Sequence, residues 1–266
     1  MSDFLQTMAT RSAARAAAAP TTFTSADFDK PVVPLALGAF DVIAEIKERS
    51  PAEGDLGGQN MDRRSRAERY AAAGAAAISV LTEPSRFDGE LSHLEEVALA
   101  VPDTAVMRKE FLVEPVQVLE ARKAGASGVL LIIAMLSDAK LREMLDCAFE
   151  HGLFVLLEAF DERDLERASA LLENAADADR AAGGQLLIGV NTRNLRTLEV
   201  DPDRLQTLAP LLPHARCVAE SGLLDAHDAA RVAGLGYTLA LVGSALMRSD
   251  DPGALVQAMR QAGAAA

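Results

Sequence analysis

From residue 42 onward, short runs with β-strand character alternate with longer helical patterns, eight times in succession along the chain. The strand-like runs cover residues 42–47, 77–82, 105–109, 129–133, 153–158, 186–191, 217–220 and 239–243. The helical patterns cover 61–73, 91–100, 115–124, 137–151, 162–182, 202–212, 226–233 and 253–261. Because every crossover is helical, the strands are predicted to be parallel. Eight such units predict an α/β fold, a closed eightfold β/α barrel.

A doubly wound open sheet is the alternative architecture for alternating strands and helices. Such a sheet more often has about five to seven strands and a glycine-rich dinucleotide turn after the first strand, and the sequence has neither feature. We therefore expect one barrel domain over 40–266, preceded by an N-terminal helix and a connector over 1–39. The helix is predicted over 1–19 and ends at Pro20.

The acidic composition restricts the partners of the chain. A formal net charge of −13, with no clustered basic patch, argues against nucleic acid or an anionic membrane. No apolar run of about 18 residues suggests a transmembrane helix. Cys147 and Cys217 match no disulfide or metal framework, and the four histidines show no metal-ligand spacing. We therefore expect a cytoplasmic protein without a metal site.

The first strand carries an acid and a base within an apolar run. In the stretch from Val42 to Gly54, the side chains of Ile43, Glu45 and Lys47 share one face of the strand. If both faces are covered, these two charges lie in the interior, where burial is costly unless they are paired or used in chemistry. The alternative is an exposed edge strand with a solvated Glu/Lys face.

Several other predicted strands also end in polar side chains. The residues in question are Lys109, Glu158, Asn191 with Arg193 just beyond it, and Glu220 followed by Ser221. By strand parity Lys109, Glu158, Asn191 and Glu220 point into the barrel, whereas Arg108 points outward to a helix. Two lysines and three carboxylates in one mouth can shift each other's pKa values in opposite directions, as acid–base catalysis at neutral pH requires. The alternative is a mutually neutralising ion-pair network that only plugs the barrel.

Three loops at the predicted mouth favour an anion. Ser50 follows the first strand, Ser221 and Gly222 follow the seventh, and Gly243 and Ser244 follow the eighth. Backbone amides near glycines and helix N-termini bind phosphate, and the loops after strands seven and eight are its usual place in β/α barrels. Phe87 and Phe111, in loops after the second and third strands, could pack on an aromatic substrate or simply anchor their loops.

Seven ordered blocks of the sequence resemble the indole-3-glycerol-phosphate synthase family over about Phe40 to Arg248. The blocks are IAEIKERSP, ISVLTEPSRFDG, MRKEFLVEPVQVLEARKAGASGVLLI, LLEAF, IGVNTRNLRTLEVD, VAESG and LVGSALMRSDDP. The resemblance implies an eightfold β/α (TIM) barrel with an extra N-terminal helix over the mouth. It also implies a carboxy-lyase of tryptophan biosynthesis that needs no metal or organic cofactor. We expect a monomer and leave contacts with other enzymes of the pathway open.

The implied reaction converts 1-(2-carboxyphenylamino)-1-deoxyribulose 5-phosphate to indole-3-glycerol phosphate, carbon dioxide and water. By the same resemblance, Lys109 protonates the carbonyl oxygen during ring closure, with Glu45 and Lys47 beside it. Lys47 could also hold the substrate carboxylate or donate a proton in the dehydration. Glu158 and Glu45 are assigned to proton transfer in the dehydration, and which of them is the base stays open.

The remaining assignments concern binding. Asn191 and Arg193 would orient the anthranilate carboxylate and hydroxyls, and Glu220 would position Lys109 or a substrate hydroxyl. The phosphate would be held by Ser50, Ser221, Gly222, Gly243 and Ser244, and the anthranilate ring would be flanked by Phe87 and Phe111.

The sequence departs from the family pattern at a few positions. Ala52 and Glu53 replace a frequent Ser and a basic or small residue, and the extra negative charge could weaken phosphate binding slightly. Thr192 replaces a frequent Asn, and Glu110 replaces a frequent Asp.

Two other functions are weighed against the synthase. Phosphoribosylanthranilate isomerase is a related barrel enzyme, but its reaction resembles one that uses a Cys and Asp pair at strand ends, which this chain does not supply. A barrel that binds a phosphorylated ligand without turnover is the other alternative.

Overall fold

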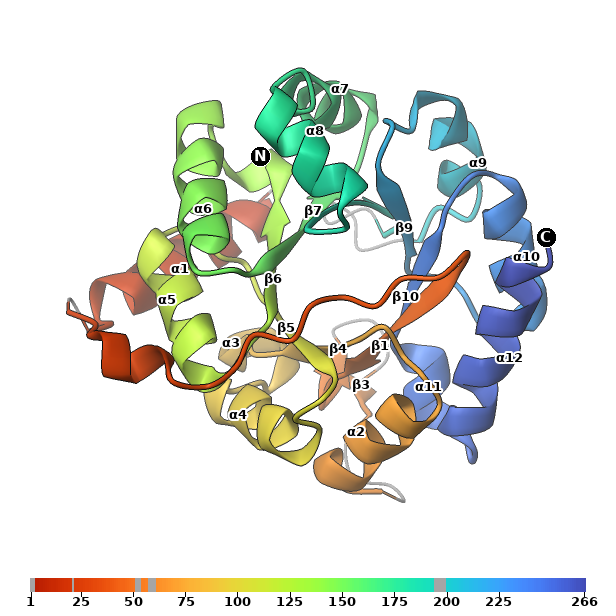
Figure 1. The fold of residues 1–266 in the computed structure, drawn as a ribbon, viewed down its shortest axis with the longest axis horizontal. Coiled ribbons are helices and arrows are strands. Elements are labelled where there is room, and N and C mark those ends of the chain that lie inside the picture. The colour runs from red at the N-terminus through yellow and green to blue at the C-terminus, as the bar shows by residue number, and fades with distance from the viewer. Residues whose placement is uncertain (1–2, 21, 51–53, 57–60, 194–199) are drawn as a thin grey trace.

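Eight parallel strands close into a barrel in the computed structural model, which describes residues 3–20, 22–50, 54–56, 61–193 and 200–266. The strands are β1 (Asp41–Ile46), β4 (Ala77–Leu81), β5 (Ala105–Lys109), β6 (Gly128–Ile132), β7 (Phe154–Ala159), β8 (Leu186–Asn191), β9 (Arg216–Glu220) and β10 (Leu239–Val242). Each strand pairs with its neighbours in chain order, and β10 closes on β1 (Figure 1). The predicted eightfold barrel is therefore confirmed, and the open sheet is excluded.

Helices surround the barrel, as the alternating pattern predicted (Figure 1). They are α1 (Asp3–Ala17), α2 (Arg63–Ala72), α3 (Pro84–Phe87), α4 (Leu91–Ala100), α5 (Pro115–Ala124), α6 (Asp138–Glu150), α7 (Glu162–Leu171), α8 (Ala175–Ala182), α9 (Arg204–Leu208), α10 (Ala226–Gly234), α11 (Ser244–Arg248) and α12 (Pro252–Ala264). Short 3-10 turns η1 (Ser25–Phe28), η2 (Ile133–Met135) and η3 (Ala209–Leu211), and a hairpin of β2 (Arg49–Ser50) and β3 (Gly54–Asp55), complete the described structure. None of the described helices is long and apolar enough to cross a membrane.

Two of the predicted helices are interrupted. The pattern over 162–182 forms two helices, α7 and α8, because the Asn174 side chain accepts a hydrogen bond from the Ala176 N–H and starts a new helix there. The pattern over 202–212 forms α9 followed by the turn η3, which contains Pro210, a residue without an N–H group for a helix. Periodicity alone detects the apolar stripe but not these breaks.

Both faces of β1 are covered, which excludes an exposed edge strand. All six residues of β1 are buried, and the strand is flanked by β10 and β4. Its inward face carries Ile43 and Glu45 and lies in register with Leu241 of β10 and Ser79 of β4. An acid placed on that face therefore lies inside the barrel.

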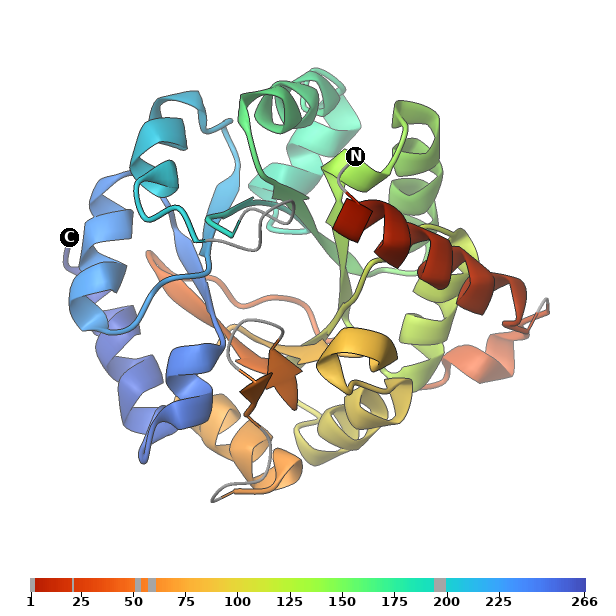
Figure 2. The same ribbon diagram turned by 180° about the vertical axis from the view of Figure 1, so that it is seen from behind.

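Helix α1 lies across the rim of the barrel, on the face where the β2–β3 hairpin is also seen (Figure 2). It buries Leu5, Met8, Ser12 and Ala16, which share one stripe of the helix. The amide of Gln117 in α5 donates a hydrogen bond of 2.8 Å to the Ser12 hydroxyl. This helix is held by apolar packing and by a buried polar contact with the barrel wall.

We expect Met8→Ala to lower the free energy of unfolding by about 2 kcal/mol, because truncation of a fully buried methionine leaves a cavity under α1. Gln6→Ala, on the exposed side of the same helix, is the matched control and should stay within about 0.5 kcal/mol of the parent. Urea unfolding of the three proteins measures the difference. Equal stabilities would show that α1 does not pack as described.

Candidate active site

A cavity of about 190 Å³ opens at the carboxyl ends of the strands, where the barrel predicts its site. Thirteen of the fourteen residues selected from the sequence line it: Glu45, Lys47, Ser50, Phe87, Lys109, Phe111, Glu158, Asn191, Arg193, Ser221, Gly222, Gly243 and Ser244. The fourteenth, Glu220, does not line the cavity, because it is fully buried next to Lys109. The residues predicted from strand parity and from the loops at the strand ends therefore lie around one cavity.

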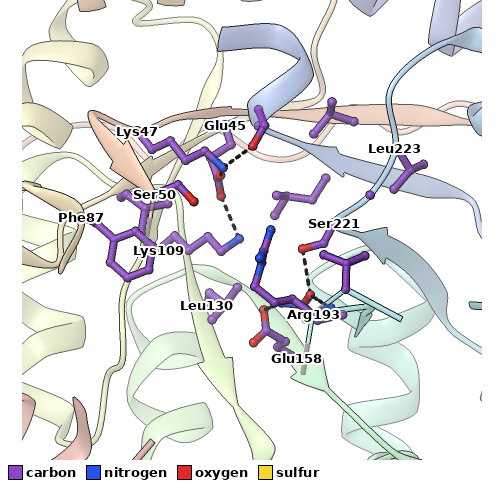
Figure 3. A pocket seen from close by; sticks show the side chains of 18 of the residues that line it. Glu45, Lys47, Ser50, Phe87, Lys109, Leu130, Glu158, Arg193, Ser221 and Leu223 are labelled. Carbon is purple, nitrogen blue, oxygen red and sulfur yellow. Dashed lines mark hydrogen bonds and ion pairs between the residues drawn. The ribbon is translucent and has the colours of Figure 1, made fainter. Parts of the chain in front are cut away.

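The ammonium group of Lys109 is held among carboxylates (Figure 3). Its Nζ lies 2.8 Å from Glu45 Oε2 and 3.8 Å from Glu220 Oε2. Burial alone would lower the pKa of Lys109, but the surrounding acids, first of all the ionised Glu45, outweigh that effect and raise the pKa above its ordinary value. Lys109 therefore carries its proton at neutral pH.

Glu45 bridges the two lysines. Its other oxygen lies 3.1 Å from Lys47 Nζ, and Lys47 in turn donates a hydrogen bond of 3.0 Å to the Ser244 hydroxyl at the start of α11. Burial raises the pKa of Glu45, but the charges of Lys109 and Lys47 dominate and hold the pKa at about 2. Glu45 is therefore ionised in the folded protein at neutral pH.

Glu158 and Glu220 form a pair of buried carboxyl groups on the opposite side of Lys109. Burial and the adjacent Glu158 raise the pKa of Glu220 well above its ordinary value of 4.5. Burial also raises the pKa of Glu158, against the attraction of Lys109. No described group hydrogen-bonds to the Glu220 oxygens. The proximity of the two carboxyl groups raises the pKa of Glu220 and opposes the rise in the pKa of Glu158. A close pair of buried acids favours one shared proton, and the stronger shift places it on Glu220.

Asn191 connects this carboxyl pair to the loop after β9. Its amide nitrogen donates to Glu158 Oε2 over 3.1 Å, and its amide oxygen accepts from the Ser221 hydroxyl over 2.9 Å. The Arg193 backbone N–H donates to the same amide oxygen. Ser221 has a φ of +68°, a left-handed conformation that is costly for a residue with a side chain and is often kept at functional sites.

The residues of the phosphate-type loops all line the cavity. Ser50 is buried, Gly222 follows Ser221 with a φ of +77°, and Gly243 precedes α11, whose first residue Ser244 contacts Lys47. Ala52 and Glu53, the proposed source of a weakening negative charge, lie outside the described residues.

Three phenylalanines, Phe4, Phe87 and Phe111, form an aromatic wall of the cavity. One of them, Phe4, was not predicted from the sequence. Phe111 lies 6.2 Å from Phe87, centroid to centroid, and 5.9 Å from Phe4, which it meets edge-on. Phe4 comes from α1 and lines the cavity. The helical pattern of the N-terminal segment predicts a helix but not where that helix docks, so no local signal in the sequence identified Phe4.

A cluster of ion pairs that the sequence did not predict lies beside the mouth of the barrel. Glu110 lines the cavity and forms ion pairs with Arg108 and with Arg15 of α1, and it accepts a hydrogen bond from Thr82. Arg108 points outward as predicted and donates to the Gln117 carbonyl. Glu110, which stands where the family frequently has Asp, therefore links α1 to the end of β5 through its ion pairs.

Among the described residues, one group has the geometry of a metal site: Asp225, His227 and Asp228, near the start of α10. Asp225 is the N-cap of α10 and accepts from the backbone N–H groups of His227 and Asp228. Asp228 accepts from the Leu224 N–H. Helix capping thus accounts for this group.

Known proteins are similar to this chain in sequence and in fold. A profile described as indole-3-glycerol phosphate synthase matches residues 28–259. A protein of that name from Nocardioides sp. is 47% identical over 239 residues, covering 88% of this chain and 86% of its own, and one from Parafrankia sp. is 44% identical over 223 residues, covering 84% and 78%.

Among solved structures, 3-hexulose-6-phosphate synthase from Salmonella typhimurium superposes with a TM-score of 0.62 at 18% identity, covering 84% of this chain and 98% of its own. At that identity the match bears on the fold alone, and it confirms the barrel. The profile and the two relatives cover most of the chain and agree on one family. The chain belongs to the indole-3-glycerol phosphate synthase family.

Proposed function

We propose that this chain closes the indole ring of 1-(2-carboxyphenylamino)-1-deoxyribulose 5-phosphate, giving indole-3-glycerol phosphate, carbon dioxide and water. The observation that carries the proposal is the position of Lys109. Its ammonium group contacts Glu45 beside a cavity that is lined both by an aromatic wall and by the phosphate-type loops. A substrate with an aryl group and a phosphate at its two ends fits this arrangement with its carbonyl group near the lysine.

The two ends of the substrate are bound by different chemistry. The anthranilate ring packs against Phe4, Phe87 and Phe111, where apolar burial and ring contacts favour it. The phosphate is held by backbone amides and hydroxyls of the loops after β1, β9 and β10, with the positive charge of Lys47 nearby. Arg193 and Asn191 orient the carboxylate that is to be lost.

Ring closure needs a proton donor at the carbonyl oxygen. The ring carbon that bears the carboxylate attacks the ribulose carbonyl carbon, and Lys109 gives a proton to the oxygen as negative charge develops on it. Loss of carbon dioxide then returns the ring to aromaticity. Glu45 and Glu220 keep the ammonium group pointed at the reacting oxygen, and the raised pKa of Lys109 favours the uptake of a replacement proton from solvent after the transfer.

Dehydration needs both an acid and a base. The hydroxyl formed in the first step leaves as water with a proton from Lys47 or Lys109, while a carboxylate removes a proton from the neighbouring carbon to form the double bond. Glu158 is suited to this base role, because it lines the cavity and burial raises its pKa above the ordinary value, which makes it a stronger base. Glu45 is ionised but is paired with two lysines, which makes it the weaker base.

The alternatives fit less well. Neither cysteine of the chain lines the cavity: Cys147 lies on α6, and Cys217 lies on β9 with the opposite strand parity to the inward-facing Glu220, so the Cys/Asp pair of an isomerase is not available there. A binder without turnover would not need a lysine and a proton-sharing carboxyl pair buried together, since burying such groups costs stability unless they are used.

Lys109→Ala is expected to lower kcat by a factor of about 10²–10⁴, because the general acid for ring closure is lost. Lys123→Ala is the matched control, since that lysine is exposed on α5 and pairs with Asp27 far from the cavity. Product is measured by indole fluorescence, which is read against little background because the chain contains no tryptophan. Equal rates for Lys109→Ala and the parent would refute the assignment, and tight substrate binding without product in the parent would favour the binder.

Phe4→Ala is expected to raise KM about tenfold with a smaller change in kcat, because an aromatic contact to the bound ring is removed. Phe23→Ala is the control, since Phe23 stacks on Phe28 and does not line the cavity. Steady-state kinetics on both variants decides, and an unchanged KM for Phe4→Ala would place the aryl group elsewhere.

The pH dependence of the stability of Glu220→Gln tests whether Glu220 holds a proton in the folded protein. A carboxyl group whose pKa is raised on folding keeps its proton after the unfolded chain has lost it, so the folded protein loses stability as pH rises above the ordinary pKa of 4.5. The glutamine variant has no such group at this position. Its melting temperature relative to the parent should therefore increase between about pH 5 and about pH 8, while its activity falls. A difference that does not vary with pH would mean that Glu220 is ionised.

A further inference from the structure

Three glycines face the barrel interior, and a neighbouring side chain occupies the space above each. A Cβ atom at Gly128 would collide with the ring of Phe154, one at Gly189 with the carboxyl group of Glu220, and one at Gly243 with that of Glu45. Gly189 is not among the residues with positive φ, so its backbone accepts any amino acid. Residue 189 is therefore restricted to glycine by the lack of room for a side chain and not by the backbone conformation.

We propose that Gly189 is a positioning residue for the reaction: the empty space above it lets the carboxyl groups of Glu158 and Glu220 meet beside Lys109. The proposal rests on the proposed function, because it concerns the same carboxyl pair. It assigns a role to a glycine that does not itself line the cavity.

The strand register places Gly189 between the two acids. Glu158 of β7 is the register partner of Gly189, so the two side-chain positions adjoin on one interior face. On the other side of β8, Glu220 of β9 is the register partner of Asn191, one inward position nearer the mouth. Glu220 therefore reaches Glu158 only by leaning back across Gly189, where any side chain would stand between the two carboxyl groups.

The distances identify what would have to move. A Cβ at Gly189 would lie closer than 3.0 Å to Glu220 Oε1 and 3.1 Å from Glu220 Cδ, with Leu156 Cδ1 at 3.1 Å on its other side. Leu156 is packed in the barrel core, whereas the Glu220 carboxyl is the far end of a flexible side chain. The glutamate would yield, and its contacts with Lys109 and Glu158 would change while the barrel stays closed.

The electrostatic surroundings of Glu220 make this displacement measurable. The charged groups that act on it come from three strands: Glu158 on β7, Lys109 on β5 and Glu45 on β1. Moving its carboxyl away from Glu158 weakens the proton sharing, so the two acids titrate more independently. A change in the pH dependence of turnover follows, which simple loss of packing would not produce.

The test is Gly189→Ala, compared with Gly128→Ala and with the parent. Gly189→Ala is expected to lower kcat about 100-fold with KM within about threefold, and to shift the acidic limb of the kcat–pH profile to higher pH, because Glu158 loses the neighbour that lowers its pKa. Gly128→Ala adds the same methyl group to the same barrel interior, but against an apolar ring. It should lower the melting temperature and leave the pH profile unchanged. Identical pH profiles for Gly189→Ala and the parent, or a shift that Gly128→Ala shares, would overturn the proposal.

Glu220→Asp provides a rescue arm. The shorter acid should tolerate alanine at 189, so the alanine substitution should cost less activity in the Glu220→Asp background than in the parent. If Gly189→Ala folds poorly, the same cycle is read on melting temperature, where Glu220→Asp should return part of the loss. Equal losses in both backgrounds would contradict the proposal. A parent enzyme that makes no indole product would instead refute the proposed function, while the melting-temperature cycle would still test the steric contact.

Discussion

The site depends on one buried cation, the ammonium group of Lys109. A lysine taken out of water is destabilising unless carboxylates surround it, and here Glu45 contacts it at 2.8 Å and Glu220 at 3.8 Å. Those acids are in turn expensive to bury, and each is offset differently: Glu45 by a second lysine, and Glu220 by holding a proton shared with Glu158. The eight-stranded barrel is the scaffold that brings these side chains together from strands far apart in the sequence.

The polar contacts form a continuous path across the mouth. It runs from Ser244 through Lys47, Glu45 and Lys109 to Glu220, and then through Glu158 and Asn191 to Ser221. Both of its ends are hydroxyl groups in loops proposed to bind the phosphate. Under the proposed assignments, the side chains that contact the phosphate also orient the acid–base groups.

The sequence predicted the fold and most of the site because two periodicities carry that information. Alternation along each strand correctly placed Glu45, Lys109, Glu158 and Asn191 inside the barrel, and Arg108 outside it. What it could not predict depends on contacts between distant segments. Phe4 was missed because the docking of α1 is set by packing and by the pairing of Arg15 with Glu110. That Glu220 is fully buried and does not line the cavity was missed because its burial depends on packing against residues of other strands. The break between α7 and α8 was missed because one capping asparagine outweighed a long apolar stripe.

The central claim is that Lys109 delivers a proton to the carbonyl oxygen of a substrate held at both ends. The most direct measurement is a crystal structure with the substrate analogue whose ribulose carbonyl is reduced to an alcohol, which cannot cyclise. The account predicts the phosphate at Ser50 and Ser244, the aryl ring against Phe111, and the alcohol oxygen within hydrogen-bond distance of Lys109 Nζ. An analogue bound with its alcohol oxygen away from Lys109, or with its two ends exchanged, would contradict it.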